Sequence, residues 1–183
     1  GEWTSDPNSR GKVSDGGPAD VDRALSLLAK RQHGVASRRQ LLELGIRPRT
    51  VDYRIERARL HPVHNGVYAV GHPGLTAHGR WMAAVLAHGP TAVLSHRSAA
   101  SLWDVMRSAR TTIEVTAGRR WSRPGVELHR SRLVGDEVTV HDGIPVTSVP
   151  RTLLDLAGVV GRHALERAIE RAEARRLTDP LSL

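Results

Sequence analysis

The chain has 183 residues, of which 39% are hydrophobic and 25% charged, as is ordinary for a soluble globular protein. It contains no cysteine, which excludes a disulfide framework and a thiolate zinc site and allows a reducing cytoplasm, where we expect it to reside. The longest apolar runs are far too short to cross a bilayer. The formal net charge of +8 favours a polyanionic partner, most often a nucleic acid.

Residues 1–18 differ in composition from the rest. The segment from Thr4 to Ser9 reads like the remnant of a cloning site, and a polar, glycine-rich stretch follows it. We therefore expect residues 1–18 to be a flexible tag remnant and leave them out of the fold reasoning.

Two helices are predicted next. The first starts near Asp20 and ends at Gly34, and the residues of its apolar face recur at helical spacing: Val21, Ala24, Leu25 and Leu28. The second opens at Ser37 as N-cap, with Gln40 as its capping-box partner. Its predicted buried residues are Leu41, Leu42 and Leu44.

A third helix and a hairpin follow. Pro48 suits the first turn of the helix, and Val51, Ile55 and Ala58 are spaced to face inward. Asn65-Gly66, flanked by two short β runs, is a strong signal for a tight hairpin. Helix, helix, turn, helix and a two-stranded wing, in this order, predict a winged helix-turn-helix over residues 19–74.

The third helix carries the candidate DNA-reading residues. Between Lys30 and Leu60 nine basic side chains face only three acidic ones, a net charge of +6. In such motifs the second helix of the turn lies in the major groove, where arginine can contact guanine or phosphate. The alternative is a solvated basic face on a domain that contacts proteins. The predicted DNA-binding residues are Arg38, Arg39, Arg47, Arg49, Thr50, Tyr53, Arg54 and Arg57, with His64 and Asn65 of the wing as weaker candidates.

Residues 75–183 predict a second, α+β unit. Helices are expected from Thr76 to His88 and from about Ser95, and two more close the chain. Three or four strands are expected between these helical ends, with residues typical of a turn at His141-Asp142-Gly143. The expected strand segments are TTIEVTA, GVELHRS, DEVTVHD and IPVTSV. The fold class is therefore α+β, with a winged helix-turn-helix in front.

The sequence does not favour metal binding, nuclease activity or a Ser/His nucleophile. The histidines lack cysteines and a His-Glu-x-x-His pattern, so we expect no metal site. Asp104 with Glu114 distantly resembles the acidic pair of restriction-type nucleases, but Thr116 stands where that site carries lysine; we expect one outward-facing acid on a strand instead. Ser95 and His96 are neighbours at a helix start, so we expect an N-cap and not a reactive pair. We accordingly expect no catalytic residue and no cofactor.

The chain resembles the AbiEi-type antitoxin and transcriptional-regulator family of type IV toxin–antitoxin systems. The resemblance extends from about Asp20 to Leu177 and rests on four segments: GVASRRQLLELGI, LHPVHNGVYAVG, AVLSHRSAASLW and DGIPVTSVPRTLLDLAG. It implies a winged helix that binds inverted repeats in its own promoter, joined to an antitoxin domain, and a neighbouring nucleotidyltransferase-like toxin. A homodimer would match a palindromic operator.

Two departures leave alternatives open. Many long relatives continue into a restriction-like nuclease domain, whereas this chain stops at Leu183, so it is either the N-terminal part of a larger protein or naturally short. Relatives without a partner gene would be solitary regulators. A third reading is a protein-interaction module that neutralises a toxin directly.

Overall fold

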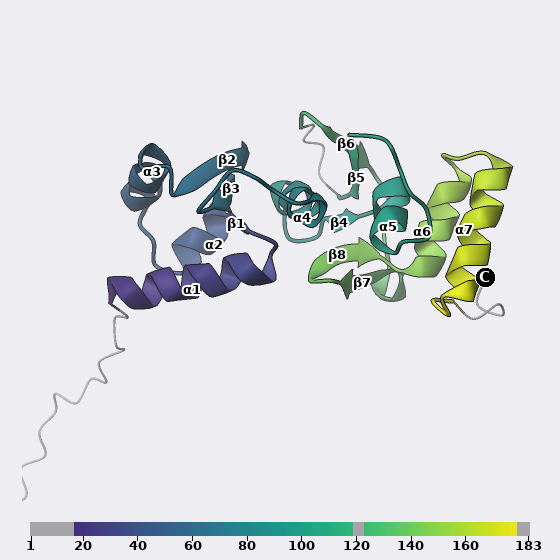
Figure 1. Ribbon diagram of the computed structural model, residues 1–183, viewed down its shortest axis with the longest axis horizontal. Coiled ribbons are helices and arrows are strands. Elements are labelled where there is room, and N and C mark those ends of the chain that lie inside the picture. The colour runs from purple at the N-terminus through teal and green to yellow at the C-terminus, as the bar shows by residue number, and fades with distance from the viewer. Residues whose placement is uncertain (1–16, 119–122, 179–183) are drawn as a thin grey trace, which may run out of the picture.

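The computed structural model describes residues 17–118 and 123–178, and their fold is α+β with seven α-helices and two β-sheets (Figure 1). The expectation for residues 1–18 lies outside the described residues except at its last two positions, where Pro18 already begins a helix. The molecule is elongated, with the first sheet toward one end and the second sheet toward the other. None of the described helices combines the length and apolar character that a bilayer crossing requires.

The first sheet is antiparallel, has the order β1-β3-β2 and packs with three helices. Its core consists of buried apolar side chains from every element, with Leu41 and Val51 fully enclosed. Burying about 25 cal/mol per Å² of apolar surface is what holds such short elements together. The elements are α1 (Pro18–Arg31), β1 (Val35–Ser37), α2 (Arg38–Glu43), α3 (Pro48–Glu56), β2 (Leu60–His64) and β3 (Val67–Val70).

Local signals set the boundaries of α2 and of the hairpin. Ser37 Oγ accepts a hydrogen bond from the Gln40 backbone N at 3.3 Å, and Gln40 Oε1 accepts one from the Ser37 backbone N at 2.9 Å. The predicted capping box is therefore confirmed. The turn between β2 and β3 lies at Asn65-Gly66 as predicted, and there Gly66, at φ 75°, takes the left-handed conformation.

Two expectations for this region were wrong, and one strand was not predicted. Residues Val35–Ser37 form a third strand, β1, because they pair with β3, a long-range contact that a three-residue apolar run does not signal. Leu42 is 43% exposed, because one turn of a six-residue helix can bury only one side. Ala58 is exposed with φ 52°, because α3 ends before it and the chain reverses there.

The second sheet has the order β6-β5-β4-β8-β7, with β4–β8 and β5–β6 parallel and the other pairs antiparallel. The four predicted strands are present, and the turn at Asp142-Gly143 is confirmed, with φ of 48° and 74°. The central β4 was not predicted, because it is only two residues long. The elements are α4 (Ala77–Ala87), β4 (Val93–Leu94), α5 (His96–Leu102), β5 (Ile113–Thr116), β6 (Val126–His129), the 3-10 helix η1 (Gly135–Glu137), β7 (Val138–His141), β8 (Ile144–Thr147), α6 (Val149–Ala157) and α7 (Arg162–Ala174).

Helix α4 lies between the two sheets and joins them through one core (Figure 1). Val35 and Val67 of the first sheet pack in the same cluster as Leu94 and Val146 of the second. The β7–β8 turn also meets the loop after α1, where the Asp142 carbonyl oxygen lies 2.6 Å from His33 Nε2. The boundary predicted near residue 74 stays a prediction: the first sheet has its own apolar cluster around Leu41 and Val51, and a second cluster around α4 is shared by both sheets.

Candidate functional site

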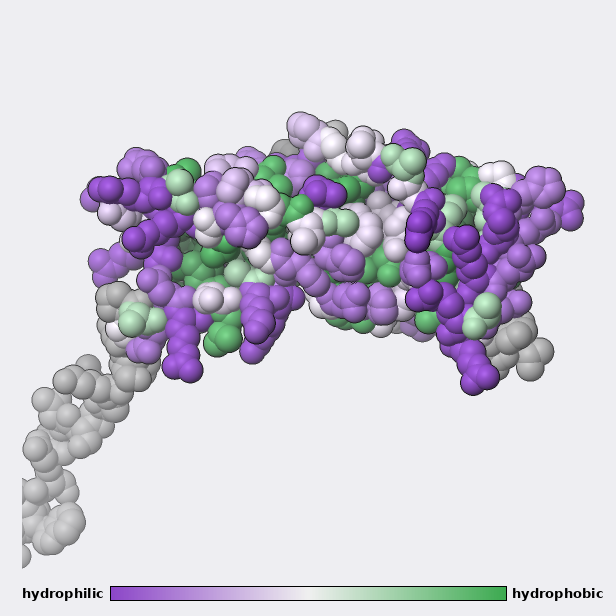
Figure 2. All heavy atoms as spheres, viewed as in Figure 1, coloured by the Kyte–Doolittle hydropathy of each residue, from purple (hydrophilic) through white to green (hydrophobic). Residues whose placement is uncertain are grey.

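One candidate site is the outward face of α3. Arg47, Arg49, Tyr53 and Arg57 are all exposed there, and Tyr53 is 51% exposed. The Arg57 guanidinium lies over the Tyr53 ring, 5.3 Å from its centre, within the range of a cation–π contact. Hydrophilic side chains cover this end of the molecule in Figure 2. The face can therefore present guanidinium groups to a polyanion.

Arg54 does not project outward as the sequence predicted. Its side chain is only 15% exposed and pairs with Asp22 of α1 through Nη2 and Oδ1. Arg54 is three residues after the fully buried Val51 and so lies near the side of α3 that meets α1. The pair links α3 to α1 and neutralises one charge that was assigned to DNA.

The other predicted DNA-binding residues differ in their exposure and in whether an acidic side chain pairs with them. Arg38 Nη1 lies 3.4 Å from Asp52 Oδ1 and 3.3 Å from Tyr68 Oη, and Arg39 Nε lies 3.1 Å from Glu43 Oε1. The hydrogen bond to Tyr68, with a smaller contribution from Asp52, raises the pKa of Arg38, so Arg38 stays a cation. Thr50 is half-buried, whereas Asn65 at the hairpin turn is exposed.

His64 is half-buried beside the same turn. Burial lowers the pKa of His64 below its ordinary value, and the positive charges of Arg123 and His88 act in the same direction. The lowered pKa favours the neutral form of His64 near pH 7 in the free protein.

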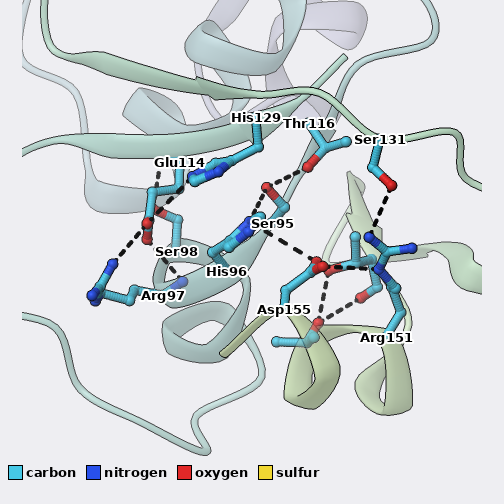
Figure 3. Close-up of polar contacts among 12 residues, drawn as sticks. Ser95, His96, Arg97, Ser98, Glu114, Thr116, His129, Ser131, Arg151 and Asp155 are labelled. Carbon is cyan, nitrogen blue, oxygen red and sulfur yellow. Dashed lines mark hydrogen bonds and ion pairs between the residues drawn. The ribbon is translucent and has the colours of Figure 1, made fainter. Parts of the chain in front are cut away.

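A second candidate site is a buried polar cluster in the other unit (Figure 3). Glu114 of β5 is only 1% exposed, yet its carboxylate is ionised and both of its oxygens accept hydrogen bonds from Arg97. Its Oε1 accepts from Arg97 Nη1 at 3.0 Å, and its Oε2 accepts from the Arg97 backbone N at 2.8 Å. Burial alone would raise the pKa of Glu114, but the adjacent His129 imidazole, the hydrogen bond from the Arg97 backbone N and the Arg97 charge together lower it. The expectation of an outward-facing acid was wrong, because β5 is an inner strand of the sheet.

His96 lies at the middle of this cluster. Its ring stacks on His129 with centroids 3.5 Å apart, and its Nδ1 lies 3.0 Å from Ser95 Oγ and 3.9 Å from Asp155 Oδ2 (Figure 3). Its backbone φ is 51°, a conformation that costs a residue with a Cβ atom free energy. Ser95 is at the predicted N-cap position, but its hydroxyl makes no cap bond and instead contacts Thr116 and His96. The two neighbouring side chains therefore do meet, although their position at a helix start predicted that they would not face each other.

The cluster lacks the geometry for nucleophilic catalysis. In a serine relay the nucleophile and the carboxylate must contact different ring nitrogens, so that the imidazole passes a proton between them. Here Ser95 and Asp155 both lie next to Nδ1 of His96. Ser95 is also completely buried, so a substrate cannot reach its hydroxyl.

The described side chains that come nearest to a metal-binding arrangement are Glu114, Glu127 and His129. His129 Nε2 lies 3.5 Å from Glu114 Oε1 and 3.9 Å from Glu127 Oε1. The Arg97 guanidinium, 3.0 Å from the same Glu114 oxygen, already supplies the positive charge there. A divalent ion would have to bind against that cation, which costs Coulomb energy. Asp104 plays no part in this cluster, because its carboxylate is 2.7 Å from Arg175 Nη1.

We expect the buried His96 to make the protein less stable in mild acid. Burial lowers the pKa of His96, with His129 and Arg151 acting in the same direction and Asp155 and Glu114 opposing them. The unfolded chain therefore takes up a proton before the folded one does, and stability falls as the pH drops below about 6.5. Urea unfolding of the wild type and of His96→Asn at about pH 7.5 and about pH 5.5 measures this.

Asparagine suits this position because it tolerates positive φ and does not titrate. The wild type should lose more stability than His96→Asn between the two pH values. His163→Asn is the matched control, because His163 is 90% exposed on α7. Equal acid sensitivity of the wild type and His96→Asn would contradict the expectation.

No model of a known protein family matches the chain, and no curated protein is significantly similar to it. The resemblance carried by the four sequence segments therefore stays an expectation.

Proposed function

We propose that this protein is a transcriptional regulator that binds duplex DNA through a winged helix-turn-helix formed by α1 to β3. The observation that carries the proposal is a set of three exposed arginines, Arg49 on α3 and Arg47 and Arg57 at its two ends, on a segment with a net charge of +6. A helix of about 10–12 Å diameter fits the major groove. Arg47 and Arg49 then lie at the helix end that enters first, where side chains reach base edges.

The order of elements supports the winged-helix assignment. Helix, strand, two helices and a two-stranded hairpin enclose one core, and the short strand β1 closes the sheet beside the hairpin. The tight Gly45 turn between α2 and α3 has φ 84°. These features are what a groove-binding helix with a β hairpin at its side requires.

For the second unit we propose an antitoxin-like role, on the basis of the sequence resemblance. In this reading the protein binds inverted repeats in its own promoter as a homodimer, and its partner is a nucleotidyltransferase-type toxin. The buried Glu114–Arg97 pair then has a structural role, holding α5 against β5, and no catalytic residue is assigned.

The proposal predicts binding that is steeply dependent on salt. Fluorescence anisotropy with a labelled duplex from the protein's own promoter should show log affinity falling linearly with log salt concentration, with a slope near −0.9 for each phosphate neutralised. A scrambled duplex of equal length is the control for sequence preference. The absence of duplex binding at low salt would refute the DNA-binding assignment.

A further inference from the structure

An open hollow of about 620 Å³ lies beside α3 and the hairpin, and both units line it. Asp52 and Ile55 of α3 form one wall, and the hairpin residues around Asn65 form another. Arg38, at the start of α2, and Arg123, just before β6, bring two guanidinium groups to the same space.

The charges in this hollow are not balanced. Asp52 is the one acidic residue among those that line it, and its carboxylate is exposed and 3.4 Å from Arg38 Nη1. Arg123 donates from Nη2 to the Ala87 carbonyl oxygen at 3.3 Å, but its Nε is buried without a hydrogen-bond partner among the described residues. A buried donor without an acceptor costs about 1–3 kcal/mol. Because Nε is enclosed, a ligand in the hollow would contact the guanidinium through its Nη atoms and not through Nε.

We propose that Arg38 and Arg123 form a phosphate-binding site shared by the two units. Guanidinium groups bind phosphate through paired, charge-assisted hydrogen bonds, and the exposed Asn65 amide adds a donor at the rim. The site rests on the proposed function in one respect: a duplex with α3 in its major groove would carry its sugar–phosphate strand between α3 and the hairpin, across this hollow. The second unit thereby takes part in binding and is not a passive attachment.

The phosphate has two possible sources, a DNA backbone or a free phosphate-bearing molecule, and two measurements separate them. The first is anisotropy with a labelled duplex for the wild type, R38Q, R123Q and the double variant, across a salt series. Each single variant should bind about tenfold more weakly on every sequence, and the double variant should lose about one unit of salt slope. R167Q, an exposed arginine of α7 remote from the hollow, is the matched control and should leave both quantities unchanged.

The second measurement is thermal unfolding in inorganic phosphate against chloride at equal ionic strength, without DNA. Stabilisation of the wild type and R167Q but not of the double variant assigns a free phosphate ligand to the site. An effect in the anisotropy series alone assigns the DNA backbone. If the double variant matches R167Q in both measurements, the inference is overturned. If the wild type binds no duplex, the proposed function fails, and the phosphate measurement still decides the site.

Discussion

Replacing Glu114 with alanine is expected to lower the free energy of unfolding by about 3–5 kcal/mol. The carboxylate is 1% exposed and binds Arg97 through both oxygens, while Arg97 itself is only 19% exposed. Removing the acid leaves Arg97 Nη1 and the Arg97 backbone N–H without their acceptors, while Nη2 keeps its hydrogen bond to the Val159 carbonyl oxygen. Each orphaned donor adds a desolvation cost. Urea unfolding of the wild type and Glu114→Ala measures the loss.

The control is Glu166→Ala, because Glu166 and its partner Arg162 are 45% and 88% exposed. Such a surface pair contributes about 0–1 kcal/mol. An equal decrease in the free energy of unfolding in the two variants would show that the buried Glu114–Arg97 pair stabilises the fold no more than a surface pair does.

The same carboxylate gives the protein a second acid transition. Because its pKa is lowered in the folded state, the contribution of Glu114 is present above its unfolded pKa of about 4.5 and is lost as the pH falls through the folded pKa. Glu114→Gln should be less stable than the wild type at neutral pH, and this difference should shrink in strong acid. A difference that does not change with pH would contradict the assignment of an ionised Glu114.

Arg49→Ala and Arg54→Ala are expected to affect DNA binding in different ways. Arg49 is exposed and has no charged partner among the described side chains, so its loss should cost about 1–3 kcal/mol of binding and relax sequence preference, provided that α3 reads DNA as proposed. Arg54 is paired with Asp22, so Arg54→Ala should leave the salt slope unchanged and weaken binding only through the orientation of α3. Anisotropy across a salt series, with both duplexes described above, distinguishes the two outcomes.

Asp22→Asn tests the role of the ion pair from the other side. If Arg54 acts through Asp22, this variant frees a guanidinium and should steepen the salt slope, and a double-mutant cycle on unfolding should show coupling between the two positions. A salt slope that falls by about one unit in Arg54→Ala, as in Arg49→Ala, would show that Arg54 leaves Asp22 to bind phosphate.

Sequence reasoning succeeded where the signal is local. The Ser37–Gln40 capping box, the Asn65-Gly66 turn and the Asp142-Gly143 turn each depend on the conformational preference or hydrogen-bonding reach of a few adjacent residues. It failed at β1 and β4, which are three and two residues long and exist only because distant strands pair with them.

For the candidate sites, too, the sequence predicted the local features but not those that depend on distant residues. The concentration of arginine on α3 is visible in the composition of one segment, but which guanidiniums remain available is not, because Asp22 lies 32 residues from Arg54. Glu114 was noticed as an acid on a strand, while its partners Arg97 and His129 gave no signal of their own. Their sequence spacing matches no motif.

The sequence by itself determined the α+β class, the capping box of α2, the tight turns and the placement of positive charge, because each follows from short-range backbone preferences or from composition. Only the tertiary structure decided that α4 joins two sheets in one core, that Arg54 is neutralised by α1, and that Arg38 and Arg123 share one hollow. These features depend on which distant segments pack together to bury apolar surface, and no local preference encodes that outcome.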